Sequence, residues 1–222
     1  MKPWLWLSWS SGKDSAWALQ ALRRQAEYEV AGLLTSINEA AGRVAMHAVR
    51  EALLERQAEA AGLPLIKVHI PSPCPNEAYE AAMTGAMAQA KREKVAAIAF
   101  GDLFLEDVRR YREEKLAPTG MKPVVPIWGL ETAALAREMV ASGLRAHITC
   151  VDPKQLDAAF AGRTFDDSFL DDLPDGVDPC GEKGEFHSFA WSGPMFEQPI
   201  PVTPGEIVER DGFVFADLLA GD

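Results

Sequence analysis

The 222-residue sequence has few cysteines, no long apolar run and a shortage of positive charge. Its three cysteines, Cys74, Cys150 and Cys180, stand far apart and form no CxxC pair, which argues against a disulfide framework and against a zinc site. No stretch reaches the roughly 18 apolar residues that a membrane span requires, and the N-terminal region shows no cleavable signal pattern. We therefore expect a soluble, cytoplasmic protein with reduced cysteines and no membrane partner.

The charge balance is acidic, with 22 Lys and Arg against 33 Asp and Glu and a formal net charge of −11. Such a surface field repels nucleic acid, which is therefore an unexpected partner. Hydrophobic residues make up 48% of the chain, enough to bury a sizeable core in one domain or in one domain with a small appendage.

Apolar runs alternate with helical segments through the first two thirds of the chain. Strands are expected at residues 3–7, 28–35, 65–70, 95–100, 123–128 and 145–151, and helices at 16–22, 51–61, 76–94, 107–116 and 131–142. This alternation predicts βαβ units and a mainly parallel α/β sheet. After Asp152 the pattern changes to an acidic, turn-rich segment at 166–178 and a hairpin centred on Asp211-Gly212. We expect an α/β domain over residues 1–151 and a smaller C-terminal lobe over 152–222.

The segment Ser10-Ser11-Gly12-Lys13-Asp14-Ser15 lies between the first expected strand and the first helix. A helix N-terminus presents unpaired backbone N–H groups and the positive end of its dipole to an anion. Small residues let that backbone approach a phosphate closely, and Lys13 adds a point charge. The spacing is not that of the Walker loop. An ordinary polar turn is the alternative, but the position directly after the first strand favours phosphate binding.

A second segment, Gly101-Asp102, follows the fourth strand at the edge of the sheet where ligands bind in open α/β folds. Gly101 would let the backbone pass close to a nucleotide, and Asp102 could accept from a hydroxyl or hold a metal through water. Four cations follow within seven residues, Arg109, Arg110, Arg112 and Lys115. They form either a clamp for phosphate or carboxylate or a solvated helix face.

A third segment runs from Gly181 to Ser188, and its carboxylates Glu182 and Glu185 flank Gly184. The glycines predict a tightly bent backbone on which the two carboxylates converge, a geometry that suits Mg²⁺, an amine or ammonium. The alternative is an exposed charged loop that leads into a strand at 186–191. A thiol nucleophile at Cys180 with His187 as its base is disfavoured, because no orienting third group can be identified.

These three segments together resemble the diphthine–ammonia ligase family and its bacterial relatives, and the loop at 10–15 is similar to the Ser-Gly-Gly-Lys-Asp-Ser loop of N-type ATP pyrophosphatases. The resemblance also takes in residues 43–47 (Arg-Val-Ala-Met-His), 126–128 (Pro-Ile-Trp), Arg110, Arg112 and Glu114; the segment 181–188 is its most specific part. It implies a Rossmann-like fold of the adenine nucleotide α-hydrolase type, with parallel strands in the order 3-2-1-4-5.

The same resemblance implies an ATP-dependent, amide-forming ligase. In that chemistry Mg·ATP adenylates a carboxylate, and ammonia or another amine then attacks to give an amide, AMP and pyrophosphate. In eukaryotic and archaeal members the carboxylate belongs to a modified histidine on elongation factor 2, so the implied acceptor is a carboxylate on a protein. A homodimer is compatible with the sequence, which leaves the oligomeric state open.

The family motifs assign roles residue by residue. Residues 10–15 would bind the phosphates, with Asp14 near the magnesium ion, and Thr35, Gly101 and Asp102 would face the rest of the nucleotide. The acceptor side would be lined by Arg110, Arg112, Glu114, Glu182, Gly184, Glu185, Phe186 and His187. Catalysis is expected to depend on Lys13, Asp14, Arg110, Arg112, Glu182 and Glu185.

Three positions depart from the family pattern: Ser11 replaces Gly, Ile127 replaces Leu and Ser188 replaces Thr. None of these changes removes a charge, so the expectation of ATP use stands. Two rival functions are a tRNA-thiolating ATP pyrophosphatase and a non-catalytic adenine-nucleotide-binding protein. The first would need paired cysteines or iron–sulfur ligands and a basic face. The second would have no need of the acceptor-side cluster at 182–187.

Overall fold

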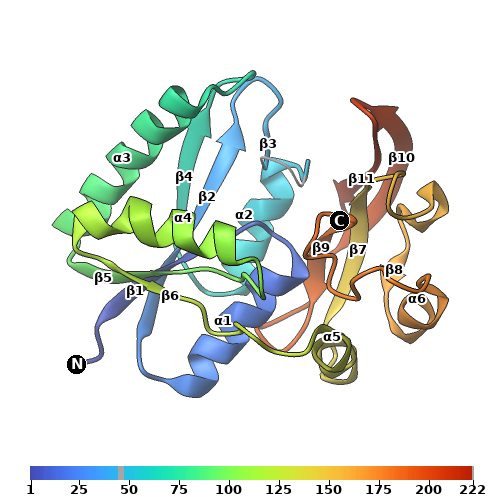
Figure 1. Ribbon diagram of the computed structural model, residues 1–222, viewed down its shortest axis with the longest axis horizontal. Coiled ribbons are helices and arrows are strands. Elements are labelled where there is room, and N and C mark those ends of the chain that lie inside the picture. Colours follow the sequence, from blue (N-terminus) through green and yellow to red (C-terminus); the bar gives the residue numbers. More distant parts are fainter. Residues whose placement is uncertain (45–47, 222) are drawn as a thin grey trace.

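The computed structural model describes residues 1–44 and 48–221 and contains two sheets (Figure 1). The first sheet is built on five parallel strands, and the two-residue strand β3 (Arg43–Val44) pairs antiparallel with the end of β2. Across the sheet the parallel strands are β4 (Leu65–Ile70), β2 (Glu29–Asn38), β1 (Trp4–Ser8), β5 (Val95–Ala99) and β6 (Lys122–Val124). Counted along the chain this order is 3-2-1-4-5, which confirms the expected Rossmann-like sheet.

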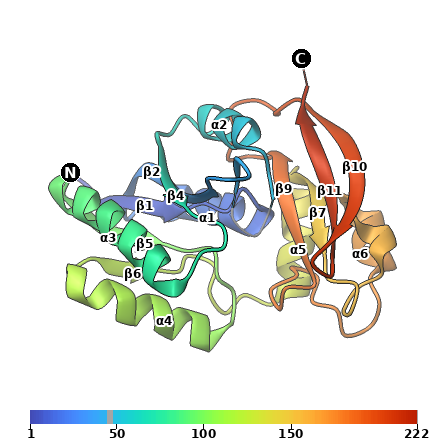
Figure 2. The same ribbon diagram turned by 90° about the horizontal axis from the view of Figure 1, so that it is seen from above.

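Helices cover both faces of this sheet (Figures 1 and 2). The helices α1 (Lys13–Gln25) and α2 (Glu51–Ala60) pack on one face, and α3 (Asn76–Arg92) and α4 (Glu106–Leu116) pack on the other. A short 3-10 helix, η1 (Ala117–Thr119), extends α4. The α2 helix ends where expected, because Gly62 with its φ of +65° takes the left-handed conformation common after helix ends.

The second sheet is antiparallel and makes up the smaller lobe. Its central strand β7 (Arg145–Val151) pairs with β8 (Thr164–Phe165), β9 (Phe186–Ser192) and β11 (Phe213–Ala220), and β11 pairs in turn with β10 (Val202–Arg210). Helices α5 (Thr132–Ala141) and α6 (Asp167–Asp172) and the 3-10 helix η2 (Ala158–Phe160) complete the lobe. The β10–β11 turn is at Asp211-Gly212, as predicted, and both residues have positive φ.

The expected placement of the strand at 145–151 was wrong. The sequence analysis counted it as a sixth strand, after the strands of a mainly parallel sheet. It is instead β7, the centre of the antiparallel sheet. A short apolar run shows that a strand is buried but does not show which neighbours it pairs with. The division of the chain after residue 151 stays a prediction, and the sheets themselves separate between β6 and β7.

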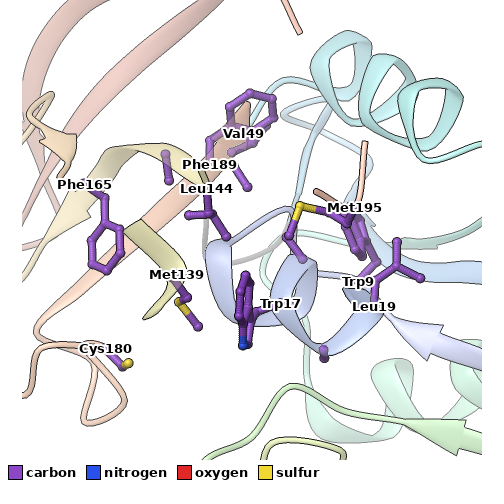
Figure 3. Close-up of a cluster of buried hydrophobic side chains, with 14 of the residues drawn as sticks. Trp9, Trp17, Leu19, Val49, Met139, Leu144, Phe165, Cys180, Phe189 and Met195 are labelled. Atoms are coloured by element: carbon purple, nitrogen blue, oxygen red, sulfur yellow. The ribbon is translucent and has the colours of Figure 1, made fainter. Parts of the chain in front are cut away.

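One hydrophobic core joins the two lobes, because α1 contacts β1 and β2 on one side and β9 on the other. Figure 3 shows Trp17 of α1 beside Met139 of α5 and Leu144. The α1 helix therefore lies between the two sheets (Figure 2), and its first turn is at their junction. Within the described ranges, the structure contains no helix with the length and hydropathy needed to cross a membrane.

A cluster of three charged side chains also ties the lobes together. Arg43 Nη1 donates to Asp217 Oδ1 at 2.8 Å, and Arg50 donates to both oxygens of the same carboxylate. Burial opposes the ionisation of Asp217, but the hydrogen bonds from Arg50 and Arg43 outweigh it and lower the pKa of Asp217 to about 2. The ionised carboxylate thus stabilises the contact of the β3–α2 region with β11.

Replacing Asp217 with Asn should lower the free energy of unfolding by about 1–2 kcal/mol at pH 7, since two charge-assisted contacts are lost and Arg50 is half exposed. The folded-state pKa is depressed, so this stability is present above about pH 4 and is lost as the pH falls toward 2. Urea denaturation of both proteins across this range measures the difference. The control Asp171→Asn, in an exposed pair with Arg137, should change stability by less than about 0.5 kcal/mol. A difference at Asp217 that is independent of pH would contradict this assignment.

Candidate functional site

The first turn of α1 offers backbone N–H groups to a ligand. Gly12 is the N-cap residue, and as a glycine it offers no side-chain cap to the amides of the first turn. Asp14 and Ser15 follow in the first turn, so their amides lie at the positive end of the helix dipole. The Ser10 and Ser15 hydroxyls lie 3.2 Å apart beside them. An anion placed here would meet N–H and O–H donors from one short segment.

Ser11 holds this loop against the second lobe. Its carbonyl accepts from the Ala190 amide of β9 at 3.0 Å and from Gln57 Nε2 of α2 at 2.9 Å. Gln57 is fully buried and also accepts from Trp9 Nε1 and donates to the Ala190 carbonyl. Ser11 itself has φ +70°, and its buried hydroxyl has no hydrogen-bond partner among the described residues. A glycine adopts this φ without strain and has no hydroxyl to bury, which gives a physical reason for the glycine of the family pattern.

Lys13 is only 1% exposed and bridges the lobes. Its Nζ donates to both oxygens of Asp14, at 3.0 and 2.9 Å, and to the carbonyl of Cys180. Its backbone amide donates to Ser188 Oγ of β9 at 3.2 Å. Burial alone would lower the pKa of Lys13, but the charge and hydrogen bond of Asp14, together with the charges of Cys180 and Asp178, outweigh burial and raise that pKa. Lys13 is therefore an ammonium ion at the junction of the two sheets.

A polar cavity of about 210 Å³ opens at this junction. It brings together most of the residues predicted from the three sequence segments. Its lining is Ser8, Ser10, Lys13, Asp14, Ser15, Phe100, Gly101, Asp102, Arg112, Gly181, Glu182, Gly184, Phe186, His187 and Ser188. The cavity lies beyond the carboxyl ends of β1 and β5, between which the strand order reverses, and this is where ligands bind in open α/β sheets.

Arg112 supplies a second cation to the cavity. Its Nε and Nη2 donate to the two oxygens of Asp102 at 2.6 and 3.0 Å, and its guanidinium lies 4.2 Å from the centroid of the Phe100 ring. This bidentate, stacked arrangement fixes the guanidinium from both sides. Arg112 is thus held at the cavity wall with part of its positive charge already balanced.

The loop at 178–185 carries two carboxylates that the structure separates. Glu185 is 2% exposed, and its oxygens accept from the amides of Asp178 and Lys183, both at 3.0 Å. Glu182 lines the cavity, and its Oε1 accepts from the Leu103 amide at 2.7 Å. The expected convergence of the two carboxylates was wrong, because Glu185 turns inward to satisfy backbone donors of its own bent loop.

The titration of the cavity residues follows from their burial. Burial raises the pKa of Glu182 to about 7. Burial, together with the nearby charge of Lys13, lowers the pKa of His187 to about 4, so this imidazole is neutral at pH 7. Burial likewise raises the pKa of the Cys180 thiol and raises that of Cys150 to about 12, which leaves neither as a ready nucleophile.

A second, more apolar cavity of about 350 Å³ adjoins the first and shares Ser8, Phe100 and Arg112 with it. It lies between α3 and α4, and its other lining residues include Leu34, Tyr79, Met83, Met87, Ile98 and Tyr111. The sequence analysis missed these residues. Leu34 and Ser8 could have been predicted from the strands that carry them. Side chains alternate between the two faces of a strand, so these residues face the side of the sheet that α3 and α4 cover.

Several predicted site residues lie elsewhere. Arg110 and Glu114 are exposed on α4 and are not among the residues that line the polar cavity. Thr35 is buried, and its hydroxyl donates to the Trp9 carbonyl at 2.7 Å. Gly101 does line the polar cavity, and it packs on α1, where an added Cβ would lie 2.9 Å from the carbonyl carbon of Asp14. Residues 45–47 of the motif at 43–47 lie outside the described residues.

The oxygen ligands of the cavity suit a magnesium ion that is bound partly by the phosphates of a nucleotide, and not one that is held by protein side chains alone. Mg²⁺ is usually held by one or two carboxylates together with substrate phosphates and water. Asp14 lines the cavity in the first turn of α1 and offers such a carboxylate. In the described part of the chain, no group of three or more His, Cys, Asp and Glu side chains could hold a metal by itself.

Comparison with known proteins adds the family context. The family model for the diphthamide synthase N-terminal domain matches residues 5–123, and the model for the diphthamide synthase C-terminal domain matches residues 131–216. The gap between the two matches falls between β6 and α5, where the two sheets also separate.

Among individual proteins, the chain is similar to the diphthine–ammonia ligase of Homo sapiens, with 32% identity over 132 residues, and to that of Bos taurus, with 30% over 132 residues. These two matches each cover 57% of this chain and 49% of the relative. The diphthine–ammonia ligase of Danio rerio is 31% identical over 121 residues, which cover 50% of this chain and 46% of that protein. The chain thus spans about half the length of the curated relatives it matches.

Replacing Ser11 with Gly should stabilise the protein by about 1 kcal/mol. The change removes about 1–2 kcal/mol of strain from the left-handed φ, and it removes an unpaired buried hydroxyl. Against this, glycine makes the unfolded chain more flexible, which costs about 0.5–1 kcal/mol. Thermal unfolding should show a rise of about 2–4 °C for a protein of this size. Ser11→Ala keeps the strain and removes only the hydroxyl, so its gain should be smaller. A lower melting temperature for the glycine variant would show that Ser11 has a stabilising contact.

Proposed function

The chain belongs to the diphthamide synthase family, and from this premise we propose that it is an ATP-dependent ligase that forms an amide from a carboxylate and ammonia. ATP is consumed as a substrate and leaves as AMP and pyrophosphate. The acceptor we propose is the carboxylate of diphthine, for which the relatives are named, on elongation factor 2, as the family resemblance implies.

One observation carries the proposal: the N-terminus of α1, where the N-cap residue Gly12 has no side chain, lies at a polar cavity that also holds Lys13 and Arg112. Backbone amides at a helix N-terminus bind phosphate oxygens without any side chain. Lys13 and Arg112 lie in the wall of the same cavity, each paired with a carboxylate, and we propose that each also binds a phosphate oxygen when the nucleotide is present. The triphosphate is therefore proposed to lie along residues 10–15, as the sequence motif predicts.

We propose that the adjoining cavity binds the adenosine part of the nucleotide. It opens from the phosphate cavity at Ser8 and Phe100, and its lining is mainly apolar and aromatic, as is usual for sites that hold a flat ring system. We place adenosine there, with Leu34 rather than the neighbouring Thr35 facing it. The acceptor would approach from the side of Glu182, His187 and Arg112.

The proposed chemistry explains why the site needs positive charge. A carboxylate resists attack by ammonia because its oxygen is a poor leaving group, and adenylation replaces that oxygen with AMP. Lys13 lies where it can stabilise the charge that develops on pyrophosphate as the bond between the α- and β-phosphates breaks. A magnesium ion bound through Asp14 and the phosphates would supply further charge stabilisation.

The rival functions have less support from the site. A thiolating enzyme needs paired cysteines or iron–sulfur ligands, whereas Cys74, Cys150 and Cys180 stand far apart in the sequence and burial raises the thiol pKa of the last two. A nucleotide sensor would not need Glu182 and His187, which line the part of the cavity beyond the proposed phosphate site. We therefore retain the ligase as the proposed function.

The test is incubation of the protein with Mg²⁺, ammonium, diphthine-bearing elongation factor 2 and ATP labelled at the α-phosphate. The proposal expects labelled AMP and an equal amount of pyrophosphate. Labelled ADP would point to a different phosphoryl transfer, and unchanged ATP in the presence of this acceptor would refute the proposed reaction.

Replacing Lys13 with Met should reduce AMP release about 10²–10³-fold, which corresponds to the loss of one transition-state contact worth about 3–4 kcal/mol. Methionine keeps the length of the buried side chain, and circular dichroism checks that the variant folds. The matched control Lys91→Met, on the exposed surface of α3, should keep the wild-type rate. A wild-type rate in the Lys13 variant would remove the loop at 10–15 from the proposed site.

A further inference from the structure

Three carboxylates line the polar cavity, and only two of them are balanced by a cation. Asp14 pairs with Lys13, and Asp102 pairs with Arg112. No Lys or Arg of the described residues forms an ion pair with the third, Glu182. Its Oε1 accepts from the backbone amide of Leu103. The other oxygen, Oε2, is therefore available to a cationic ligand in this cavity.

The loop that carries Glu182 is braced so that this carboxylate keeps its place. The Glu182 amide donates to Asp178 Oδ2 at 2.9 Å, and Asp178 Oδ1 accepts from Cys180. Glu185 closes the loop from the other end through its bonds to the Asp178 and Lys183 amides. Gly181 has φ +69°, and a Cβ there would lie 2.8 Å from the Phe186 carbonyl oxygen. Such supporting bonds preorganise a reacting group.

On the basis of the proposed function, we propose that Glu182 is the proton acceptor that converts a bound ammonium ion into the ammonia nucleophile. One N–H proton passes to Glu182 Oε2, and the electron pair of that bond becomes the lone pair of ammonia. This pair forms the C–N bond to the adenylated acceptor, and the carbonyl carbon–oxygen bond to AMP breaks, with its electron pair leaving on AMP. The new amide nitrogen then releases its excess proton to solvent.

The surroundings of Glu182 suit this role better than those of the other titratable groups. The charged and titratable groups around it are Lys13 and Asp14 from α1, Asp102 after β5, Arg112 from α4, and Cys180 and His187 from its own lobe. Burial raises the pKa of Glu182 to about 7, whereas that of His187 is lowered to about 4. A base near the working pH accepts a proton most effectively, so the carboxylate is favoured over the imidazole.

The test compares two nucleophiles in the Glu182→Gln variant. Glutamine keeps the side-chain length and an oxygen for the Leu103 amide, but it cannot accept the proton. Hydroxylamine is largely uncharged at pH 8, so it attacks without first losing a proton. With diphthine-bearing elongation factor 2 and Mg·ATP, the variant should form amide from ammonium about 10²–10⁴-fold more slowly than the wild type. Its hydroxamate formation from hydroxylamine should stay close to the wild-type rate.

The controls separate the outcomes. ATP binding measured by calorimetry checks that Glu182→Gln keeps its fold, and Glu209→Gln, exposed on β10, should match the wild type with both nucleophiles. Equal losses with ammonium and hydroxylamine would assign Glu182 a structural role, and an unchanged rate with ammonium would likewise overturn the inference while the ligase function stands. A wild-type protein that forms no amide would overturn the proposed function and this inference with it.

Discussion

The attachment of the α1 N-terminus to β9 is the constraint on which the site depends. The Ser11 carbonyl accepts from the Ala190 amide, and the Lys13 amide donates to Ser188 Oγ. Lys13 Nζ adds a bond to the Cys180 carbonyl. These contacts join a parallel sheet to an antiparallel sheet at the first turn of α1. The proposed phosphate site thus belongs to neither lobe alone, and a shift of one sheet against the other would dismantle it.

The sequence predicts most elements of the fold because their signals are local. The strand at 65–70 and the helix at 51–61 are bounded by Gly62, Pro64 and Pro71, and the structure places β4 and α2 within a residue of these ranges. The sheet membership of β7 was not predictable in this way. Its partners β9 and β11 lie more than 30 residues along the chain, and an apolar strand does not reveal its neighbours. The strand at 123–128 was too long, because β6 ends at Val124 and the chain then turns, with the Trp128 amide donating to the Val125 carbonyl at 3.3 Å.

The candidate site was predictable in its location and less so in its individual side chains. Three separated motifs do meet in one cavity, which holds Lys13, Arg112 and Glu182. The orientation of Glu185 depends on how a bent loop satisfies its own amides, which residue spacing does not reveal. The face of α4 was equally hidden, because Arg112 turns inward to Asp102 while Arg110, two residues earlier, is exposed. Whether Arg110, Glu114 and Thr35 act on a ligand stays a prediction.

The most direct test of the central claim is a crystal structure of the protein with Mg²⁺ and a non-hydrolysable ATP analogue. We expect phosphate oxygens within hydrogen-bond distance of the first-turn amides of α1 at Asp14 and Ser15, with Lys13 and Arg112 beside them and the base in the cavity between α3 and α4. An analogue bound away from the α1 N-terminus, with those amides facing only water, would contradict the account.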